Sequence, residues 1–457
     1  MIGYVYFLGI GGIGMSALAR YYRHTGAFVA GYDLTPSALT LALEEEGMDI
    51  HYTDDPRNIP PQITENRENC LVIYTPALPS DHKEWQLLRD KGFDIIKRSV
   101  ALGRIARDHH TLAVAGTHGK TTTSTLLAHI LQDSGTGCTA FLGGISKNYN
   151  SNLLLSNNRF LVAEADEYDR SFLQLYPQWA LVTSADADHL DIYGTHLAVK
   201  EAFASFVSQV VPGGAAVIKK GVQIPLQRLE KTDLFTYDYE EPCDFFARNH
   251  SIGAGGIYSF DLILRGKTIP ECRLGIPGKI NVENAVGAAA LASLCGIPAP
   301  AIKKALASFR GVSRRMDVRY KSERYCYIDD YAHHPNEIRA AVQSVREWFP
   351  DRKITGIFQP HLYSRTKDFA KEFAESLDLL DQVVLMPVYP AREKPVPGVG
   401  AETICDKMQL GNRRILDAEQ IIGFIRTARP DVLLTLGAGN IDRLAGPVTE
   451  CLKEMDQ

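Results

Sequence analysis

The chain has 457 residues, of which 45% are hydrophobic and 23% are charged, a composition typical of globular proteins. Its formal net charge is −5, so neither a nucleic acid nor an acidic membrane surface is expected as a partner. The length predicts about three domains of ~150 residues each.

The first part of the chain alternates short apolar runs with helical patterns. Strands are predicted at residues 4–8, 28–31 and 70–74. A helix is predicted from Met15 to about His24, and a more polar helix runs through residues 44–46. Buried strands that alternate with amphipathic helices are typical of a parallel sheet covered on both faces.

The same pattern restarts in the middle of the chain, around a second glycine loop. The strands predicted here are residues 111–115, 160–163 and 180–183, and the helices are residues 121–132, 197–210, 284–295 and 300–308. Residues 215–273 carry glycine and proline between short apolar runs, which indicates several short strands.

A third restart follows Tyr325. The strands predicted here are residues 325–328, 354–358, 382–386 and 432–436, with a helix after Pro335 and further helices between the strands. The three restarts predict three α/β domains, at residues 1–107, 108–313 and 314–457.

The apolar stretches and the cysteines bear on where the protein acts. Glycine or charged residues interrupt every apolar stretch well before the ~20 residues of a membrane span. Residues 1–4 lack the basic start that is typical of a signal peptide. The eight cysteines form no CxxC pair and no zinc-binding spacing. We therefore expect a cytoplasmic protein with reduced thiols and no membrane partner.

The second glycine loop has the residues of a phosphate site. It lies between a predicted strand and a predicted helix, where backbone N–H groups and the positive helix end bind phosphates. In this pattern Lys120 reaches the β- and γ-phosphates of ATP and the Thr121 hydroxyl binds Mg²⁺. The general pattern has glycine where this chain has Val114, so the loop is a shortened relative. The ATP-binding residues predicted here are Gly116, Thr117, His118, Gly119, Lys120, Thr121 and Thr122.

Two acidic runs follow predicted strands downstream of this loop. Residues 164–169 read Glu-Ala-Asp-Glu-Tyr-Asp, and residues 186–191 read Asp-Ala-Asp-His-Leu-Asp. Either run alone is typical of a solvated loop. Both lie where α/β sheets bind ligands, at the carboxyl ends of strands, and Mg²⁺ prefers carboxylate oxygens. Together with the glycine loop, the runs predict an ATP–magnesium site.

Motifs spread over nearly the whole chain resemble those of one family. Besides the glycine loop and AEADEYD and DADHLD, they are GIGGIGMS at 9–16, YTPALP at 74–79, GVSRRMD at 311–317, DDYAHHPNE at 329–337, FQPHLYSRT at 358–366 and GAGNI at 437–441. These segments resemble the Mur ligases of peptidoglycan synthesis. The resemblance implies an N-terminal Rossmann-like domain for a UDP-sugar, a central P-loop ATPase-type parallel sheet, and a C-terminal Rossmann-like domain that contacts ATP and the amino acid.

The resemblance also implies a reaction. The lactyl carboxylate of UDP-N-acetylmuramate attacks the γ-phosphate of ATP to give an acyl phosphate, and the amine of L-alanine then displaces phosphate. The protein contributes positioning and charge neutralisation. The expected enzyme is a ligase that forms a carbon–nitrogen bond, with ATP and Mg²⁺ as cofactors and a weak homodimer as one possible assembly.

Matching motif positions carry the family's site residues onto this chain. The resemblance assigns metal contacts to Glu164 and His189. It assigns ATP contacts to Asn284, Arg315 and Asp330. The residues that it implies for catalysis are Lys120, His333, His361 and Arg365, with Tyr331 beside them.

The chain departs from the family at two positions. Ile280 stands where many relatives have histidine, before a helix expected at 284, which leaves Asn281 and Asn284 for the adenine. Leu362 stands where some relatives have a basic residue. Binding of the amino-acid carboxylate is therefore expected to depend on Arg365 and His333.

The first glycine loop allows a rival interpretation. Gly9-x-Gly11-x-x-Gly14 follows a strand, and Asp33 closes the next strand, as in an NAD-dependent dehydrogenase. The same geometry suits any pyrophosphate, and a dehydrogenase needs no second phosphate site. The residues that we assign to the UDP-sugar are Gly9, Gly11, Gly12, Gly14, Asp33 and Thr75.

Three other interpretations of the sequence are two related ligases and a protein that only binds its ligands. Folylpolyglutamate-type ligases share the central motifs but lack the N-terminal UDP-binding fold and the FQPHLYSRT type of segment. The murein tripeptide recycling ligase shares the GTHGKTT and EADEYD motifs, but differs after the DDYAHHP core, where this chain keeps FQPH and Arg365. These residues favour the addition of a single alanine. A binding-only protein would have no need of the Lys120, Thr121, Glu164 and His189 set.

Overall fold

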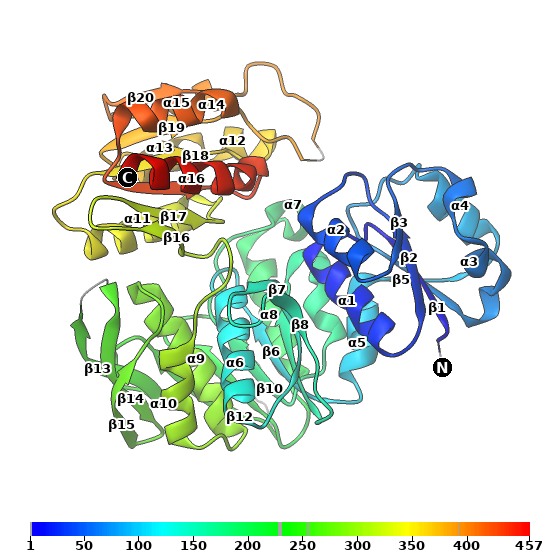
Figure 1. Cartoon of the computed structure of the whole chain (residues 1–457). Helices are drawn as coiled ribbons and strands as arrows, with labels where there is room; N and C mark the ends of the chain where they lie inside the picture. The colour runs from blue at the N-terminus through cyan, green and yellow to red at the C-terminus, as the bar shows by residue number, and fades with distance from the viewer. Residues whose placement is uncertain (1, 227–230, 254–255, 392) are drawn as a thin grey trace. The chain divides into compact units, whose positions relative to one another are not determined.

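Strands of three to eight residues form three separate sheets in the computed structural model (Figure 1). The structure describes residues 2–226, 231–253, 256–391 and 393–457, without the side chains of Leu190 and Asp191. By their contacts the residues form two compact units. The first comprises Met1–Asn249, Phe260–Cys272 and Glu283–Phe309, and the second His250–Ser259, Arg273–Val282 and Arg310–Gln457. The predicted α/β class is confirmed. The boundaries near residues 107 and 313 stay predictions.

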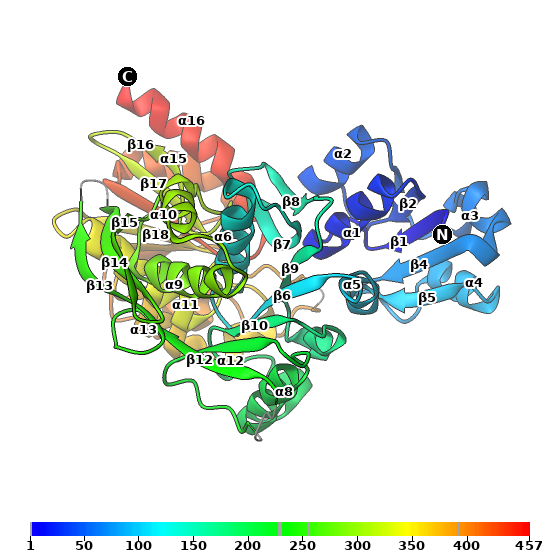
Figure 2. The same ribbon diagram turned by 90° about the horizontal axis from the view of Figure 1, so that it is seen from below.

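The N-terminal sheet is fully parallel and has the order β3-β2-β1-β4-β5. Its strands are β1 (Tyr4–Leu8), β2 (Phe28–Tyr32), β3 (Asp49–His51), β4 (Cys70–Tyr74) and β5 (Asp94–Lys97), and its helices are α1 (Ile13–His24), α2 (Ala38–Glu45), α3 (Pro61–Glu65), α4 (Lys83–Asp90) and α5 (Arg98–Ala106). Helices α1, α2 and α5 pack on one face and α3 and α4 on the other (Figure 2). The strand order reverses between β1 and β4, the place where such sheets bind ligands.

The central sheet has ten strands, in the order β15-β14-β13-β12-β11-β10-β6-β9-β7-β8. The strands are β6 (His110–Ala115), β7 (Thr139–Ser146), β8 (Ser151–Leu154), β9 (Phe160–Ala165), β10 (Trp179–Val182), β11 (Ala215–Lys219), β12 (Asp233–Asp238), β13 (Phe245–Ile252), β14 (Tyr258–Leu264) and β15 (Lys267–Arg273). The strands around β6 pair in parallel, as predicted. At one edge β7 and β8 form an antiparallel pair.

The helices of this region include one whose start was predicted too late. They are α6 (Lys120–Asp133), α7 (Leu190–Tyr193), α8 (His196–Ser208), α9 (Lys279–Leu294) and α10 (Ala299–Ser308). Helix α9 begins at Lys279, and not near 284, because burial of Val282 outweighs the weak helix preference of β-branched residues. Asn281 and Asn284 therefore lie inside the helix. The Asn281 amide donates to the Pro277 carbonyl at 2.6 Å.

The C-terminal sheet has the order β16-β17-β21-β18-β19-β20. Its strands are β16 (Asp317–Lys321), β17 (Cys326–Asp330), β18 (Ile354–Phe358), β19 (Gln382–Leu385), β20 (Arg413–Ile415) and β21 (Val432–Leu436), and its helices are α11 (Pro335–Trp348), α12 (Tyr363–Asp368), α13 (Ala370–Leu377), α14 (Ala401–Cys405), α15 (Ala418–Ala428) and α16 (Ala445–Asp456). All pairs except β16–β17 are parallel. Helices α11, α13 and α14 contribute to the core on one face, and α15 and α16 to the core on the other.

Two expectations from composition can be compared with the structure. All eight cysteines are free. Within the described ranges, no helix is both long and apolar enough to cross a membrane.

Candidate active site

The central glycine loop joins the end of β6 to the start of α6, the predicted strand–loop–helix context. Gly116 has φ +137° and Gly119 has φ +80°, conformations that favour glycine. A Cβ atom on Gly116 would lie 2.0 Å from Thr183 Oγ1 and 2.8 Å from the Ser184 nitrogen. The loop can therefore take this path only without a side chain at Gly116.

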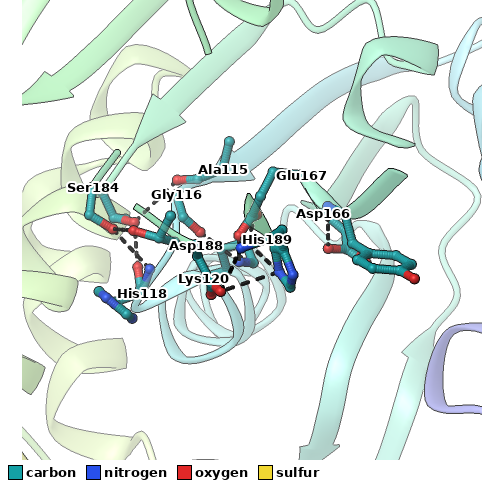
Figure 3. A network of polar contacts seen from close by, with 12 residues as sticks. Ala115, Gly116, His118, Lys120, Asp166, Glu167, Ser184, Asp188 and His189 are labelled. Atoms are coloured by element: carbon teal, nitrogen blue, oxygen red, sulfur yellow. Dashed lines mark hydrogen bonds and ion pairs between the residues drawn. The ribbon is translucent and has the colours of Figure 1, made fainter. Parts of the chain in front are cut away.

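Hydrogen bonds fasten the loop to the segment that follows β10 (Figure 3). The Ser184 hydroxyl lies 2.8 Å from the Thr117 hydroxyl and accepts from the His118 N–H at 2.8 Å. The Thr183 hydroxyl donates to the Ala115 carbonyl at 3.2 Å. Thr183 and Ser184 were not predicted as site residues. The sequence pointed to them only by their position just after a buried strand.

Lys120 opens helix α6 and lies over the loop (Figure 3). Its ammonium donates to the Gly116 carbonyl at 2.6 Å and to Glu167 Oε1 at 2.9 Å. Burial disfavours the charged lysine, but the carboxylates of Glu167, Asp166 and Glu164 outweigh this effect and raise the pKa of Lys120. Burial raises the pKa of Glu167, and Lys120 opposes that shift. A charged lysine is thus held where phosphate is expected.

Three side chains near Lys120 could hold a metal ion. Ligand atoms of Glu167, Asp188 and His189 all lie within 4.8 Å of one another. His189 Nε2 is 3.9 Å from Glu167 Oε1 and 3.8 Å from Asp188 Oδ2. Two carboxylates and one imidazole suit a divalent cation, and the carboxylates suit Mg²⁺ in particular. Of these three residues, only His189 was predicted as a metal contact. Glu167 and Asp188 were noted as members of the acidic runs, without a role.

Glu164, which was predicted as a metal contact together with Thr121 and His189, lies outside this group of three. A Cβ atom on Gly143 would lie 2.1 Å from Glu164 Oε2, so the carboxylate occupies space that this glycine leaves free. It is still close enough to Lys120 to raise its pKa. The predicted ATP contact Asn284 reaches the loop as well, because a Cβ atom on Gly119 would lie 2.7 Å from Asn284 Oδ1. Thr121 and Thr122 are buried in the first turn of α6.

In the second unit, Asp330 and Arg315 lie near each other at the end of β17. Asp330 accepts hydrogen bonds from the Met316 N–H at 2.6 Å and the Ala332 N–H at 2.8 Å. Burial raises the pKa of Asp330 to about 6, against the influence of Arg315. The Arg315 guanidinium stacks 4.9 Å from the centre of the Tyr331 ring. The two predicted ATP contacts are therefore neighbours at the end of β17.

The predicted catalytic residues of this unit also lie together. The rings of His333 and His361 are 6.1 Å apart, and His361 stacks on Tyr389 at 5.8 Å. Burial lowers the pKa of His333, and the nearby positive charge of Arg365 lowers it further. Tyr389 was not predicted as a site residue, because only the fold brings it beside His361.

The first glycine loop lies at the switch point of the N-terminal sheet. Gly9 has φ +89°, and Gly12 is the N-cap residue of α1. A Cβ atom on Gly9 would lie 2.5 Å from the Thr75 methyl group. Asp33 Oδ2 accepts from the Gly11 N–H at 2.7 Å, so the carboxylate orders the loop itself. Its predicted contact with a ribose stays a prediction.

Polar contacts fix this loop and the acidic run 164–169 in the same compact unit. Lys97 pairs with Asp169 at 2.7 Å and Arg98 with Asp166 at 3.3 Å. Arg98 also lies against Gly14, whose Cβ would be 2.9 Å from Arg98 Nη1. The two predicted phosphate sites are therefore connected through α5.

Comparison with known proteins covers nearly the whole chain. Three domain profiles of one family match in order: "Mur ligase family, catalytic domain" at residues 4–110, "Mur ligase middle domain" at 114–292 and "Mur ligase, glutamate ligase domain" at 314–439.

Curated relatives and solved structures agree with these matches. The UDP-N-acetylmuramate–L-alanine ligase of Parabacteroides distasonis is 49% identical over 98% of this chain and 97% of its own length. The enzyme of the same name from Porphyromonas gingivalis is 48% identical over 99% of both chains. The crystal structure of the UDP-N-acetylmuramate–alanine ligase of Thermotoga maritima matches 99% of both chains, with a TM-score of 0.84 and 28% identity. A murein peptide ligase from Psychrobacter arcticus shares the fold, with a TM-score of 0.71 at 22% identity over 98% of both chains.

Proposed function

The chain belongs to the Mur ligase family, and from this premise we propose that it joins L-alanine to the lactyl carboxylate of UDP-N-acetylmuramate with cleavage of ATP, in peptidoglycan precursor synthesis. The observation that carries the proposal is a pair of glycine loops in one compact unit. One has Lys120 and a candidate metal set beside it, and the other lies at the switch point of a Rossmann-like sheet. A dehydrogenase would need only the first glycine loop, at residues 9–14.

In this proposal the first unit activates the carboxylate. Lys120 neutralises charge on the γ-phosphate during its transfer to the lactyl oxygen. Glu167, Asp188 and His189 would hold Mg²⁺, with Thr121 and Glu164 contributing as the family resemblance implies. The metal would supply charge neutralisation on the phosphate oxygens. Phosphorylation gives the carboxyl carbon a leaving group.

The second unit binds the amino acid in this proposal. Arg365 binds the L-alanine carboxylate, since a planar guanidinium can form two parallel hydrogen bonds with it. Burial lowers the pKa of His333, which favours the neutral imidazole, the form that can accept a proton from the alanine ammonium group. Attack by the free amine on the acyl phosphate then releases phosphate. Arg315 and Asp330 contact the nucleotide.

The alternative substrate is a murein tripeptide, which shares the acceptor UDP-N-acetylmuramate. The names of the relatives at 43–49% identity favour the single amino acid. We further propose that the enzyme acts in the cytoplasm, where its nucleotide substrates are made, and that any homodimer is weak.

The test is phosphate release from ATP with UDP-N-acetylmuramate, in parallel reactions with L-alanine, L-serine, glycine and the tripeptide. The proposal predicts the highest kcat/KM with L-alanine, and no dependence of NAD(P)H absorbance on added enzyme. Preferential use of the tripeptide would overturn it in favour of the recycling ligase.

A further inference from the structure

Helix α12 carries Arg365, yet it begins in a way that its own residues do not stabilise. Leu362, the N-cap residue, has φ +70°, which is uncommon for a residue with a side chain. Leucine offers no side-chain acceptor to the first N–H groups of the helix, and none is used. The start of α12 therefore needs a partner from elsewhere.

That partner is Glu393, 29 residues further along the chain. Glu393 Oε2 accepts from the Ser364 N–H at 2.9 Å. Its other oxygen, Oε1, accepts from the Ser364 hydroxyl. One carboxylate thus supplies the cap that the helix lacks, and its negative charge lies at the positive end of the helix.

Tyr389, four residues before Glu393, is itself fixed to the loop that precedes α12. The Leu362 N–H donates to the Tyr389 carbonyl at 3.0 Å, and the Tyr389 N–H donates to the Pro360 carbonyl at 2.8 Å. His361 and Tyr389 form an isolated parallel bridge and stack their rings. Tyr389 therefore holds His361 directly, and Glu393 holds the start of α12, which carries Arg365, through Ser364.

We propose that Glu393 is a positioning residue for amino-acid binding: by capping α12 through Ser364, it sets the direction of Arg365. This inference rests on the proposed function, in which Arg365 binds the alanine carboxylate. A guanidinium must present two N–H groups in the plane of that carboxylate, so a small rotation of a six-residue helix lowers affinity. Glu393 itself does not contact substrate in this account.

The experiment compares steady-state kinetics of Glu393→Ala, Glu393→Gln, Ser364→Ala and Arg365→Lys with the wild type. Glu393→Ala should raise the alanine KM about tenfold while kcat and the KM values for ATP and UDP-N-acetylmuramate change by no more than about twofold. Glu393→Gln keeps an oxygen for the Ser364 N–H and should restore the alanine KM to within about threefold of the wild type. Ser364→Ala keeps that N–H, so the expected rise is about threefold.

A matched control is Glu375→Ala, which removes an exposed carboxylate on α13 that pairs only loosely, at 3.7 Å, with Lys371. It should leave all KM values unchanged. A merely structural role for Glu393 would lower the melting temperature and the fraction of active enzyme, which reduces the apparent kcat and leaves the alanine KM unchanged.

The outcomes separate this inference from the proposed function. A raised alanine KM in Arg365→Lys with a wild-type value in Glu393→Ala overturns the positioning role and leaves the function intact. A raised value in Glu393→Ala with a wild-type value in Arg365→Lys shows that Glu393 acts by another route, and also overturns it. If Glu393→Ala does not fold, the test uses Glu393→Gln, Ser364→Ala and the double variant that combines these two changes. A raised alanine KM in the double variant supports the inference. A wild-type alanine KM in all three variants contradicts it.

Discussion

Replacement of Lys120 by methionine should separate three properties of the enzyme. Turnover should be lost, because in the proposed mechanism Lys120 neutralises charge on the phosphate during its transfer. The affinity for the UDP-sugar should be unchanged, because the first glycine loop lies on the N-terminal sheet, whereas Lys120 contacts Gly116 and Glu167 beside the central sheet. The stability of the folded protein should fall, because Glu167 loses its partner.

The stability change can be sized from burial. The side chain of Lys120 is 14% exposed and that of Glu167 is 1% exposed. Removal of one partner of such a pair costs about 3–5 kcal/mol, because a buried charge is left without compensation. The double variant Lys120→Met/Glu167→Gln removes both charges and should recover most of this loss.

The pH dependence gives the sign of the effect. Burial raises the pKa of Glu167 in the folded state, and Lys120→Met removes the nearby charge that opposes this shift. The penalty in Lys120→Met is therefore absent below the ordinary glutamate pKa of about 4.3 and grows as the pH rises above it. Relative to the double variant, Lys120→Met should be equally stable at low pH and less stable at pH 7.

Denaturant unfolding of the two variants across pH measures this difference, and calorimetry measures binding of the UDP-sugar. Equal stability of the two variants at pH 7 would refute the argument from the buried pair. Loss of UDP-sugar affinity together with activity would refute the division of labour between the two glycine loops.

Four further substitutions test other parts of the site and the fold. Glu164→Ala and His189→Ala should each raise the Mg²⁺ concentration needed for half-maximal activity, and an unchanged magnesium titration would remove that residue from the metal site. Arg365→Lys should reduce kcat/KM for alanine, by a factor that corresponds to about 1.5–3 kcal/mol, with little change in the KM for ATP. A wild-type alanine KM would contradict the role of Arg365 and favour His333 and His361 as the residues that bind the carboxylate. Burial raises the pKa of Glu84 from 4.5 to about 7, so the stability that its protonated form provides is present below pH 4.5 and lost as the pH rises through 7. In denaturant unfolding, Glu84→Gln should make the free energy of unfolding less dependent on pH between 4.5 and 7. An unchanged pH dependence would contradict the raised pKa of Glu84.

Local pattern was enough to predict the strands that carry the glycine loops. Residues of β1 and β6 are almost wholly buried, so both strands read as continuous apolar runs. Strands β3 and β5 were not predicted, because they are short and only partly buried, and their sequences show neither a long apolar run nor strict alternation. The start of α9 was misplaced because tertiary burial, which one sequence does not show, outweighed propensity.

The candidate site divides in the same way. Lys120, His189 and His333 could be predicted from the sequence, because each belongs to a recognisable motif that follows a predicted strand. Ser184, Tyr389 and Glu393 are ordinary residues in sequence, and they acquire a role only because pairing between distant strands brings their segments to a loop. Glu167 and Asp188 were visible as acids, but their selection over Glu164 needed the distances between ligand atoms.

In the proposed mechanism, the lactyl carboxylate is phosphorylated before alanine attacks it. UDP-N-acetylmuramate with ¹⁸O in its lactyl carboxyl group tests this directly, in a reaction with ATP, Mg²⁺ and L-alanine. The mechanism predicts that one ¹⁸O atom per turnover appears in the inorganic phosphate, since the carboxylate oxygen that attacks the γ-phosphate leaves with it. Release of unlabelled phosphate alongside the alanyl product would contradict it.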